Sequence, residues 1–275
     1  MARDDDYVLG RSIADSIRLD AQHLLWKLHT GYELHPAIPI TSDMKIAEVG
    51  TGTAIWLFDI ARQLPPTVRL FGFDISDGQF PPKKLWPQNF SLGILDSLTK
   101  PPASLAGQFD VVHLRMWASN LRGKDTSILI SHFVNPTDVV EEPGGFIQWE
   151  EADLVHQLVE GPKAQEFERR INELFGKAGL DYSWVSGLAE SIQQGDFRII
   201  EAERSQFKHE LVHLCTNTYL MALREILQGI KGILGDQILL SVTELELNLY
   251  HLTLERANGI IYNWSPVSLL AQNKE

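Results

Sequence analysis

The chain has 275 residues, of which 44% are hydrophobic and 22% are charged, a balance that supports a large buried core and argues against wholesale disorder. Its formal net charge of -12 disfavours nucleic acid as a partner, because binding to nucleic acid depends largely on Lys and Arg side chains that neutralise phosphates. The single cysteine, Cys215, excludes an intramolecular disulfide and a cysteine-rich metal site.

The termini and the histidines add further expectations about location and metals. Residues 1–6 lack the apolar segment of a signal peptide, and no apolar run approaches the roughly 20 residues of a membrane-spanning helix. We therefore expect a cytoplasmic protein that does not enter a membrane. The histidines form no HExxH motif, and His209 and His213 have no evident third ligand, so we expect no metal site. The oligomeric state stays open, with a homodimer as one option.

The first predicted element is a helix over residues 12–30. Ser12 can cap its N-terminus, and apolar side chains follow at roughly helical spacing, namely Ile13, Ile17, Leu24, Leu25 and Leu28. Pro36 and Pro39 then break the pattern. We therefore predict a helical N-terminal cap over residues 1–40, ahead of a main domain over residues 41–275.

Strands and helices alternate from residue 45 onwards. The predicted strands cover residues 45–49, 69–74, 90–95, 109–114 and 145–150, and a helix over residues 54–63 follows the first of them. This alternation is typical of a parallel sheet with helices on both faces. The sequence thus predicts an α/β protein with a Rossmann-like sheet.

The C-terminal part predicts a different arrangement. We expect a helix over 165–178, a long strand over 198–211, two helices within 213–258 that are broken near Gly235, and a last strand over 260–272. The long strand and the returning last strand would form an antiparallel hairpin at the edge of the sheet, with a helical insertion between them.

A glycine-rich turn, Glu48-Val49-Gly50-Thr51-Gly52-Thr53-Ala54, joins the first predicted strand to its helix. Its glycines would let the backbone turn tightly and approach a ligand without a Cβ clash. The alternative is a tight turn that binds nothing.

An acidic residue follows each of the next two predicted strands. Asp74 ends the second strand, about 20 residues past the glycines, where a carboxylate can accept two hydrogen bonds from the cis-diol of a ribose. Asp96 ends the third strand and could accept a hydrogen bond from an adenine amino group. Either acid alone could be a solvated strand end. Together with the glycine-rich turn they favour an adenosine-containing ligand.

Two common adenosine ligands are disfavoured by the residues around this turn. A nicotinamide site would have the motif GxGxxG, but Ile55 stands at the third glycine position, and no P-loop motif is present. Glu48 would repel a pyrophosphate but would suit a cationic amino-acid tail. S-adenosylmethionine carries such a tail, so we expect it to be the cofactor.

At these residues the sequence resembles class I S-adenosylmethionine-dependent methyltransferases, over about residues 45–155. The stretches 7–12, 18–23, 112–116 and 143–151 resemble the fungal secondary-metabolism branch that includes LaeA-like proteins and gliotoxin-type N-methyltransferases. Ala54 departs from the pattern, because many relatives have glycine there. The antiparallel hairpin predicted above distinguishes this family's sheet from an ordinary dinucleotide-binding sheet.

The resemblance implies roles for individual residues. In it Glu48, Gly50 and Gly52 line the methionine end of the cofactor, Asp74 holds the ribose, and Asp96 with Ser97 flanks the base. The full set of implied cofactor-binding residues is Tyr7, Glu48, Gly50, Thr51, Gly52, Asp74, Ile75, Asp96, Ser97 and His113. The implied substrate-binding residues are His23, Arg115, Met116 and Trp117.

His113 is the first candidate for a general base, since an imidazole can take up a proton near neutral pH. It follows the apolar pair Val111-Val112, so we expect its ring near the mouth of the cofactor cleft. Glu150 and Glu151 are the next catalytic candidates. The alternatives are a histidine bonded to a backbone carbonyl and a solvated pair of acids at a strand end.

The sequence thus predicts S-adenosylmethionine-dependent methyl transfer to nitrogen or oxygen of a small secondary metabolite. The helices at 12–30 and 213–258 would supply a lid and pocket walls. Two other functions stay open. One is a regulatory, partner-binding protein on this fold, and the other is a repurposed enzyme that catalyses a cyclisation or an isomerisation.

Overall fold

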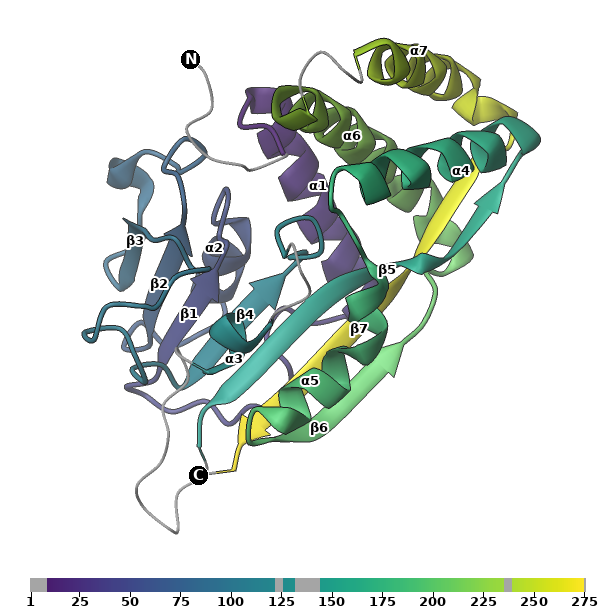
Figure 1. Cartoon of the computed structure of the whole chain (residues 1–275). Coiled ribbons are helices and arrows are strands. Elements are labelled where there is room, and N and C mark those ends of the chain that lie inside the picture. Colours follow the sequence, from purple (N-terminus) through teal and green to yellow (C-terminus); the bar gives the residue numbers. More distant parts are fainter. Residues whose placement is uncertain (1–8, 122–125, 132–143, 235–238, 275) are drawn as a thin grey trace.

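The computed structural model describes residues 9–121, 126–131, 144–234 and 239–274, which are built around one sheet (Figure 1). The sheet has seven strands in the order β3-β2-β1-β4-β5-β7-β6. Their bounds are β1 (Lys45–Val49), β2 (Arg69–Asp74), β3 (Phe90–Ile94), β4 (Val111–Arg115), β5 (Phe146–Glu160), β6 (Phe197–Arg204) and β7 (Ile261–Asn273). Strands β1 to β5 pair in parallel, and β7 runs antiparallel between β5 and β6. The predicted Rossmann-like sheet and its antiparallel edge hairpin are confirmed.

Helices cover both faces of the sheet, with α2 (Ile55–Ala61) behind it and α5 (Leu188–Gln194) in front in Figure 1. The other helices are α1 (Ile13–Thr30), α3 (Ser127–Ser131), α4 (Pro162–Lys177), α6 (His209–Leu234) and α7 (Leu239–Glu255), and short 3-10 turns lie at η1 (Lys83–Leu85), η2 (Ser183–Gly187) and η4 (Arg256–Asn258). The expected helical insertion is present as α6 and α7, between β6 and β7. Among the helices of the described residues, none combines the length and the apolarity needed to span a membrane.

Helix α1 begins at the predicted cap. Ser12 and Asp15 form a reciprocal capping box, and Gly31 ends the helix in a left-handed conformation. Its apolar side chains are mostly turned outward, namely Ile13, Ile17, Leu24 and Leu28. The buried face carries Arg18, Gln22 and His23 together with Leu25 and Trp26. A polar buried face is expected where a helix lines a cavity and forms ion pairs instead of packing into a core.

Strand β5 is much longer than the predicted strand over residues 145–150. It continues to Glu160 because β7 pairs with it along its whole length, across a bulge between Asp153 and Leu158. The buried carboxylate of Asp153 stabilises this bulge by accepting hydrogen bonds from the backbone N–H groups of Val155 and His156, at 3.1 and 3.2 Å.

The predicted strand over residues 198–211 is wrong in its second half. Strand β6 ends at Arg204, and α6 begins at His209, inside the stretch that we expected to be extended. The side chain of Asn263 explains the turn, because it accepts from the backbone N–H of Phe207 at 3.2 Å and donates to the Phe207 carbonyl at 3.1 Å. The Phe207 ring packs edge-on against Trp264, which fixes the chain reversal.

Candidate functional site

The glycine-rich turn leaves β1 and enters α2 through three residues with positive φ. Gly50 has φ +76°, Gly52 has φ +51° and Ala54 has φ +60°. The indole of Trp117 lies directly over Gly50, and its Nε1 donates to the Val49 carbonyl at 3.0 Å. The turn therefore presents bare backbone on one side and is covered by an aromatic ring on the other.

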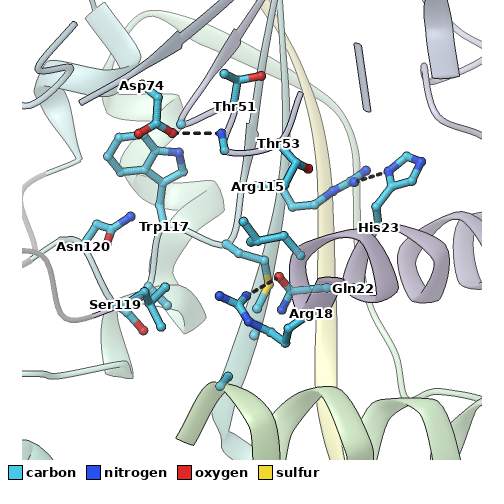
Figure 2. Close-up of a pocket in the computed structure, with 18 of the residues that line it drawn as sticks. Arg18, Gln22, His23, Thr51, Thr53, Asp74, Arg115, Trp117, Ser119 and Asn120 are labelled. Carbon is cyan, nitrogen blue, oxygen red and sulfur yellow. Dashed lines mark hydrogen bonds between the residues drawn. The ribbon is translucent and has the colours of Figure 1, made fainter. Parts of the chain in front are cut away.

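Hydrogen bonds join the turn to the end of β2. The backbone N–H groups of Gly50 and Thr51 donate to the Phe73 carbonyl at 2.8 and 2.9 Å. The N–H of Gly52 donates to Asp74 Oδ2 at 2.9 Å, a contact drawn in Figure 2. The acid predicted to hold a ribose thus lies directly beside the glycines.

A cavity opens beside this turn, at the carboxyl ends of the parallel strands (Figure 2). Twelve of the predicted site residues line it: His23, Glu48, Gly50, Thr51, Gly52, Asp74, Ile75, Asp96, Ser97, Arg115, Met116 and Trp117. Tyr7 lies outside the described residues. His113, Glu150 and Glu151 do not line the cavity. The cavity therefore brings together most of the predicted cofactor-binding residues and all of the predicted substrate-binding residues, and none of the three catalytic candidates lines it.

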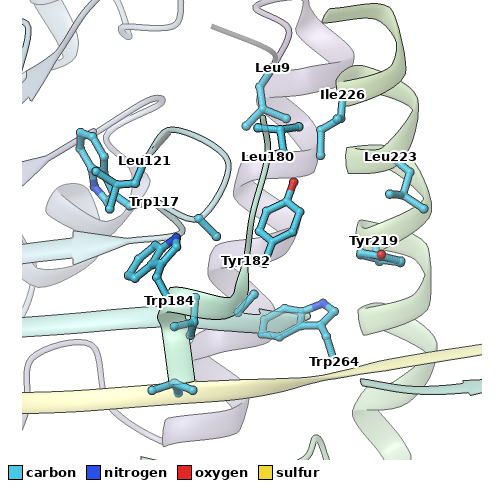
Figure 3. Close-up of a cluster of buried hydrophobic side chains, with 14 of the residues drawn as sticks. Leu9, Trp117, Leu121, Leu180, Tyr182, Trp184, Tyr219, Leu223, Ile226 and Trp264 are labelled. Atoms are coloured by element: carbon cyan, nitrogen blue, oxygen red, sulfur yellow. The ribbon is translucent and has the colours of Figure 1, made fainter. Parts of the chain in front are cut away.

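The far wall of the cavity is apolar and aromatic, and sequence reasoning did not identify its residues. Tyr182 precedes η2, Tyr219 comes from α6 and Trp264 comes from β7, and all three line the cavity and are buried. Figure 3 shows them converging from these separate elements. The helical spacing of Tyr219 and Ile226 on α6 is a signal that could have indicated this face.

His113 is fully buried, so its expected position at the mouth of the cleft is wrong. Its ring stacks on Trp56 of α2, with a centroid distance of 3.8 Å and an angle of 9°. Its Nδ1 lies 3.4 Å from Glu48 Oε1, and its Nε2 lies 3.4 Å from Glu150 Oε2. Glu48 stands opposite His113 in the β1–β4 pairing, and Glu150 lies on the neighbouring strand β5. The ring therefore lies between the two carboxylates, on the face of the sheet that α2 covers.

Glu150 is buried with both carboxylate oxygens occupied. Its Oε1 accepts from Gln148 Nε2 at 3.0 Å, and its Oε2 accepts from the Arg115 guanidinium. Burial by itself would raise the pKa of Glu150, but the charge of Arg115 and the hydrogen bond from His113 lower it to about 2. Glu150 is therefore an ion-pair partner of Arg115 and lies outside the cavity lining.

Glu151 is buried on the other face of β5. Its Oε2 accepts from the Trp117 backbone N–H at 2.7 Å and from Trp149 Nε1 at 3.3 Å, and its Oε1 accepts from the Ala152 N–H at 2.9 Å. Burial raises the pKa of Glu151 to about 7, although these donors oppose the rise. Glu151 therefore holds the segment after β4 in place. The alternative of a solvated acid pair is wrong, because both acids are buried.

His23 links α1 to Arg115. Its Nδ1 meets Arg115 Nη1 at 3.0 Å, and its Nε2 meets Asp59 Oδ2 at 3.1 Å. Burial lowers the pKa of His23, and the charge of Arg115 lowers it further. A neutral ring suits both contacts, since Nδ1 then accepts from the guanidinium and Nε2–H donates to Asp59.

The acids at the ends of β2 and β3 keep oxygen atoms available in the cavity. Asp74 also accepts from the Ser76 N–H at 3.3 Å, and burial raises its pKa against the opposing effect of its N–H donors. Asp96 is exposed, and its Oδ1 accepts from the Leu98 N–H at 3.0 Å. Each carboxylate retains lone pairs for a further donor.

The charged groups of the cavity wall suit S-adenosylmethionine better than a phosphorylated nucleotide. Three acids, Glu48, Asp74 and Asp96, face a ligand that carries an ammonium group, a ribose diol and an adenine amino group. The two arginines of the cavity wall, Arg18 and Arg115, each pair with a buried glutamate. Gly50 and Gly52 both line the cavity, so the backbone of the turn is part of its wall.

Comparison with known proteins supports the resemblance that the motifs predict. No protein-family model matches the sequence. The methyltransferase grgD of a Penicillium species is 32% identical over 179 residues, which are 62% of this chain and 60% of that protein. The N-methyltransferase tcpN of Claviceps purpurea (strain 20.1) is 31% identical over 149 residues, which are 53% of this chain and 52% of that protein. The chain has the class I methyltransferase fold. Its sequence is similar to fungal secondary-metabolism methyltransferases.

The matched stretches cover only part of each relative. This methyltransferase-fold chain spans between about half and 60% of the length of the relatives named above. Among solved structures, the [4+2]-cyclase SpnF aligns with a TM-score of 0.50 and 14% identity, over 93% of this chain and 80% of that chain. At that identity the likeness shows the shared fold alone.

Proposed function

We propose that the protein transfers a methyl group from S-adenosylmethionine to nitrogen or oxygen of a small-molecule acceptor, a secondary metabolite. The observation that carries this proposal is that the glycine-rich turn, Asp74 and the aromatic far wall line one cavity. The names of the relatives support the same reaction.

Each end of the cofactor has complementary residues in the cavity. The backbone at Gly50 and Gly52 would accommodate the amino-acid end, near the carboxylate of Glu48. Asp74 would accept hydrogen bonds from the ribose diol. Asp96, with Ser97 and Ile75 beside it, would flank the base. When bound, the cofactor supplies a methyl group that its sulfonium already activates.

The chain's own contribution is to orient the acceptor and to exclude water. Tyr182, Tyr219 and Trp264 line the far wall and are buried, which favours an acceptor with apolar or aromatic surface. Alignment of the acceptor in such a site can supply much of the rate enhancement for a bimolecular transfer. Such catalysis does not require a strong general base.

Within this proposal we favour nitrogen as the accepting atom. A neutral amine can attack without first losing a proton, whereas a hydroxyl benefits from a base. His113, Glu150 and Glu151, the three base candidates from the sequence, all lie outside the cavity wall. The relative tcpN is named an N-methyltransferase, in agreement with this preference.

Two measurements test the proposal. Titration calorimetry should show that the folded protein binds S-adenosylhomocysteine, and Asp74→Ala should weaken binding by about 1–3 kcal/mol through loss of a buried acceptor. A labelled-methyl assay against fungal metabolite extracts, read by mass spectrometry, should yield a product heavier by one methyl group. Absence of binding to both cofactor forms would reject the proposal. Turnover of a metabolite without S-adenosylhomocysteine release would instead indicate a cyclisation or isomerisation, and a stable protein complex without turnover would indicate a regulatory protein.

A further inference from the structure

The last residue of β4, Arg115, lies in the cavity wall with a nearly buried side chain, 11% exposed. Its Nε donates to Glu150 Oε2, and its Nη2 faces the same oxygen. Its Nη1 meets His23 Nδ1 at 3.0 Å, as Figure 2 shows. Among the described residues these contacts engage three of the five N–H groups of a guanidinium, so one N–H on each terminal nitrogen remains for a ligand.

Helix α1 places this guanidinium near the glycine-rich turn. Asp20 of α1 accepts a hydrogen bond from Thr53 Oγ1 at 2.7 Å, and His23, three residues later, holds Arg115. Residues three apart on a helix are neighbours, with Cβ atoms about 5–6 Å apart. One turn of α1 therefore spans from the glycine-rich turn to Arg115, on the side of the turn where the amino-acid end of the cofactor would lie.

The second arginine of the cavity is committed elsewhere. Arg18 binds Glu225 of α6 through two nitrogens, at 2.8 and 2.7 Å, so its charge is met by a bidentate partner. The carboxylate partner of Arg115 is Glu150, which also contacts His113. Both contacts involve the same oxygen, Glu150 Oε2. The geometry leaves Arg115 as the better cation for a ligand carboxylate.

We propose that Arg115 binds the α-carboxylate at the amino-acid end of the cofactor and that His23 positions the guanidinium for this contact. The inference rests on the proposed function. Asp59 and His23 on one side and Glu150 on the other hold the guanidinium before a ligand arrives, which reduces the ordering that binding requires. If Arg115 only joined α1 to β5, its substitution would affect the binding of ligands with and without a carboxylate to the same extent.

The test compares two ligands that differ at that end. S-adenosylhomocysteine carries the amino-acid carboxylate, whereas 5′-methylthioadenosine keeps the adenosine and the thioether but lacks it. Calorimetry on the full chain should show that Arg115→Met loses about 10- to 100-fold in affinity for S-adenosylhomocysteine, as expected for a hydrogen bond between charged groups. Affinity for 5′-methylthioadenosine should change less than about 3-fold, which also shows that the variant is folded. Asp74→Asn is the matched control, because it should weaken both ligands alike.

Further variants separate the contribution of Arg115 from that of His23. Arg115→Met combined with Glu150→Gln leaves no uncompensated buried charge and should show the same selective loss. His23→Phe should weaken S-adenosylhomocysteine selectively but less than Arg115→Met does, and His23→Gln, which retains an acceptor, should recover part of the loss. Equal losses for the two ligands, or full-strength S-adenosylhomocysteine binding by Arg115→Met, would overturn this inference alone. Wild-type protein that binds neither ligand would overturn the proposed function as well.

Discussion

The indole of Trp117 lies so close to Gly50 that a Cβ at this glycine would come within 2.9 Å of Trp117 Cζ2. The contact joins the segment after β4 to the turn after β1. The buried acid Glu151 fixes this segment, because its carboxylate accepts a hydrogen bond from the backbone N–H of Trp117. The floor of the cavity is therefore built from two chain segments that depend on each other.

Substitution of Gly50 should show this dependence. Gly50→Ala adds a Cβ at φ +76° and against the indole, so we expect a loss of about 2–4 kcal/mol in unfolding free energy, from the left-handed conformation together with overpacking. Gly179→Ala is the control, since Gly179 has φ +71° but nothing within 4 Å of its Cβ position, and should lose about 1 kcal/mol. Urea denaturation measures both. Equal losses in the two variants would mean that Trp117 yields without cost.

The buried pair Arg18–Glu225 should be a main connection between α1 and α6. Both side chains are 3% exposed, so Glu225→Ala would leave a buried guanidinium without its carboxylate, and we expect a loss of about 3–5 kcal/mol. Arg18→Met combined with Glu225→Leu should recover most of it. The exposed pair Arg169–Glu173 provides the comparison, because Glu173→Ala should cost less than about 1 kcal/mol. A double variant as unstable as Glu225→Ala would argue against the pairing as the cause.

Stability should fall as pH rises towards neutrality because of Glu168. Burial raises the pKa of Glu168 to about 7, against the hydrogen bonds from Tyr219, Asn172 and Gln157. A carboxyl whose pKa is raised in the folded state favours folding below its unfolded pKa, and this advantage is lost as pH rises from about 4.5 to about 7.

Glu168→Gln should flatten that part of the stability curve. Between pH 5 and pH 7.5 the unfolding free energy of Glu168→Gln should rise relative to that of the wild type by about 1–3 kcal/mol. Urea denaturation at several pH values measures this difference. Glu166→Gln is the control, because Glu166 lies two residues earlier on the same helix and is exposed. An unchanged slope in Glu168→Gln would show that another group causes the dependence, with Glu151 the next to test, since its pKa is also raised to about 7.

His113 should prove to be structural and not a base. His113→Ala removes a fully buried ring that stacks on Trp56 and stands between Glu48 and Glu150, so we expect a loss of about 2–5 kcal/mol in stability. Where the variant is still folded, the pH dependence of methyl transfer should match that of the wild type. Loss of the wild-type pH dependence in both His113→Ala and His113→Gln would contradict this and restore the base role.

Much of the fold and the cofactor side of the site can be predicted from the sequence, because their signals are local. The order of strands and helices follows from apolar periodicity, and the turn from Glu48 to Ala54 is marked by its glycines. Asp74 and Asp96 could be assigned to one site because parallel strands end at the same edge of a sheet. The chain therefore carries in its linear order the turn, the acids and the cofactor side of the cavity.

Only the tertiary structure decides the rest. Alternation along β4 and β5 divides side chains between two faces, but it does not say which face holds a cavity, and His113 and Glu150 prove to be buried under α1 and α2. The length of β5 depends on pairing with β7, more than 100 residues later. The aromatic wall likewise joins Tyr182, Tyr219 and Trp264 from three separate segments of the chain. Such contacts depend on packing between distant segments, which no local pattern encodes.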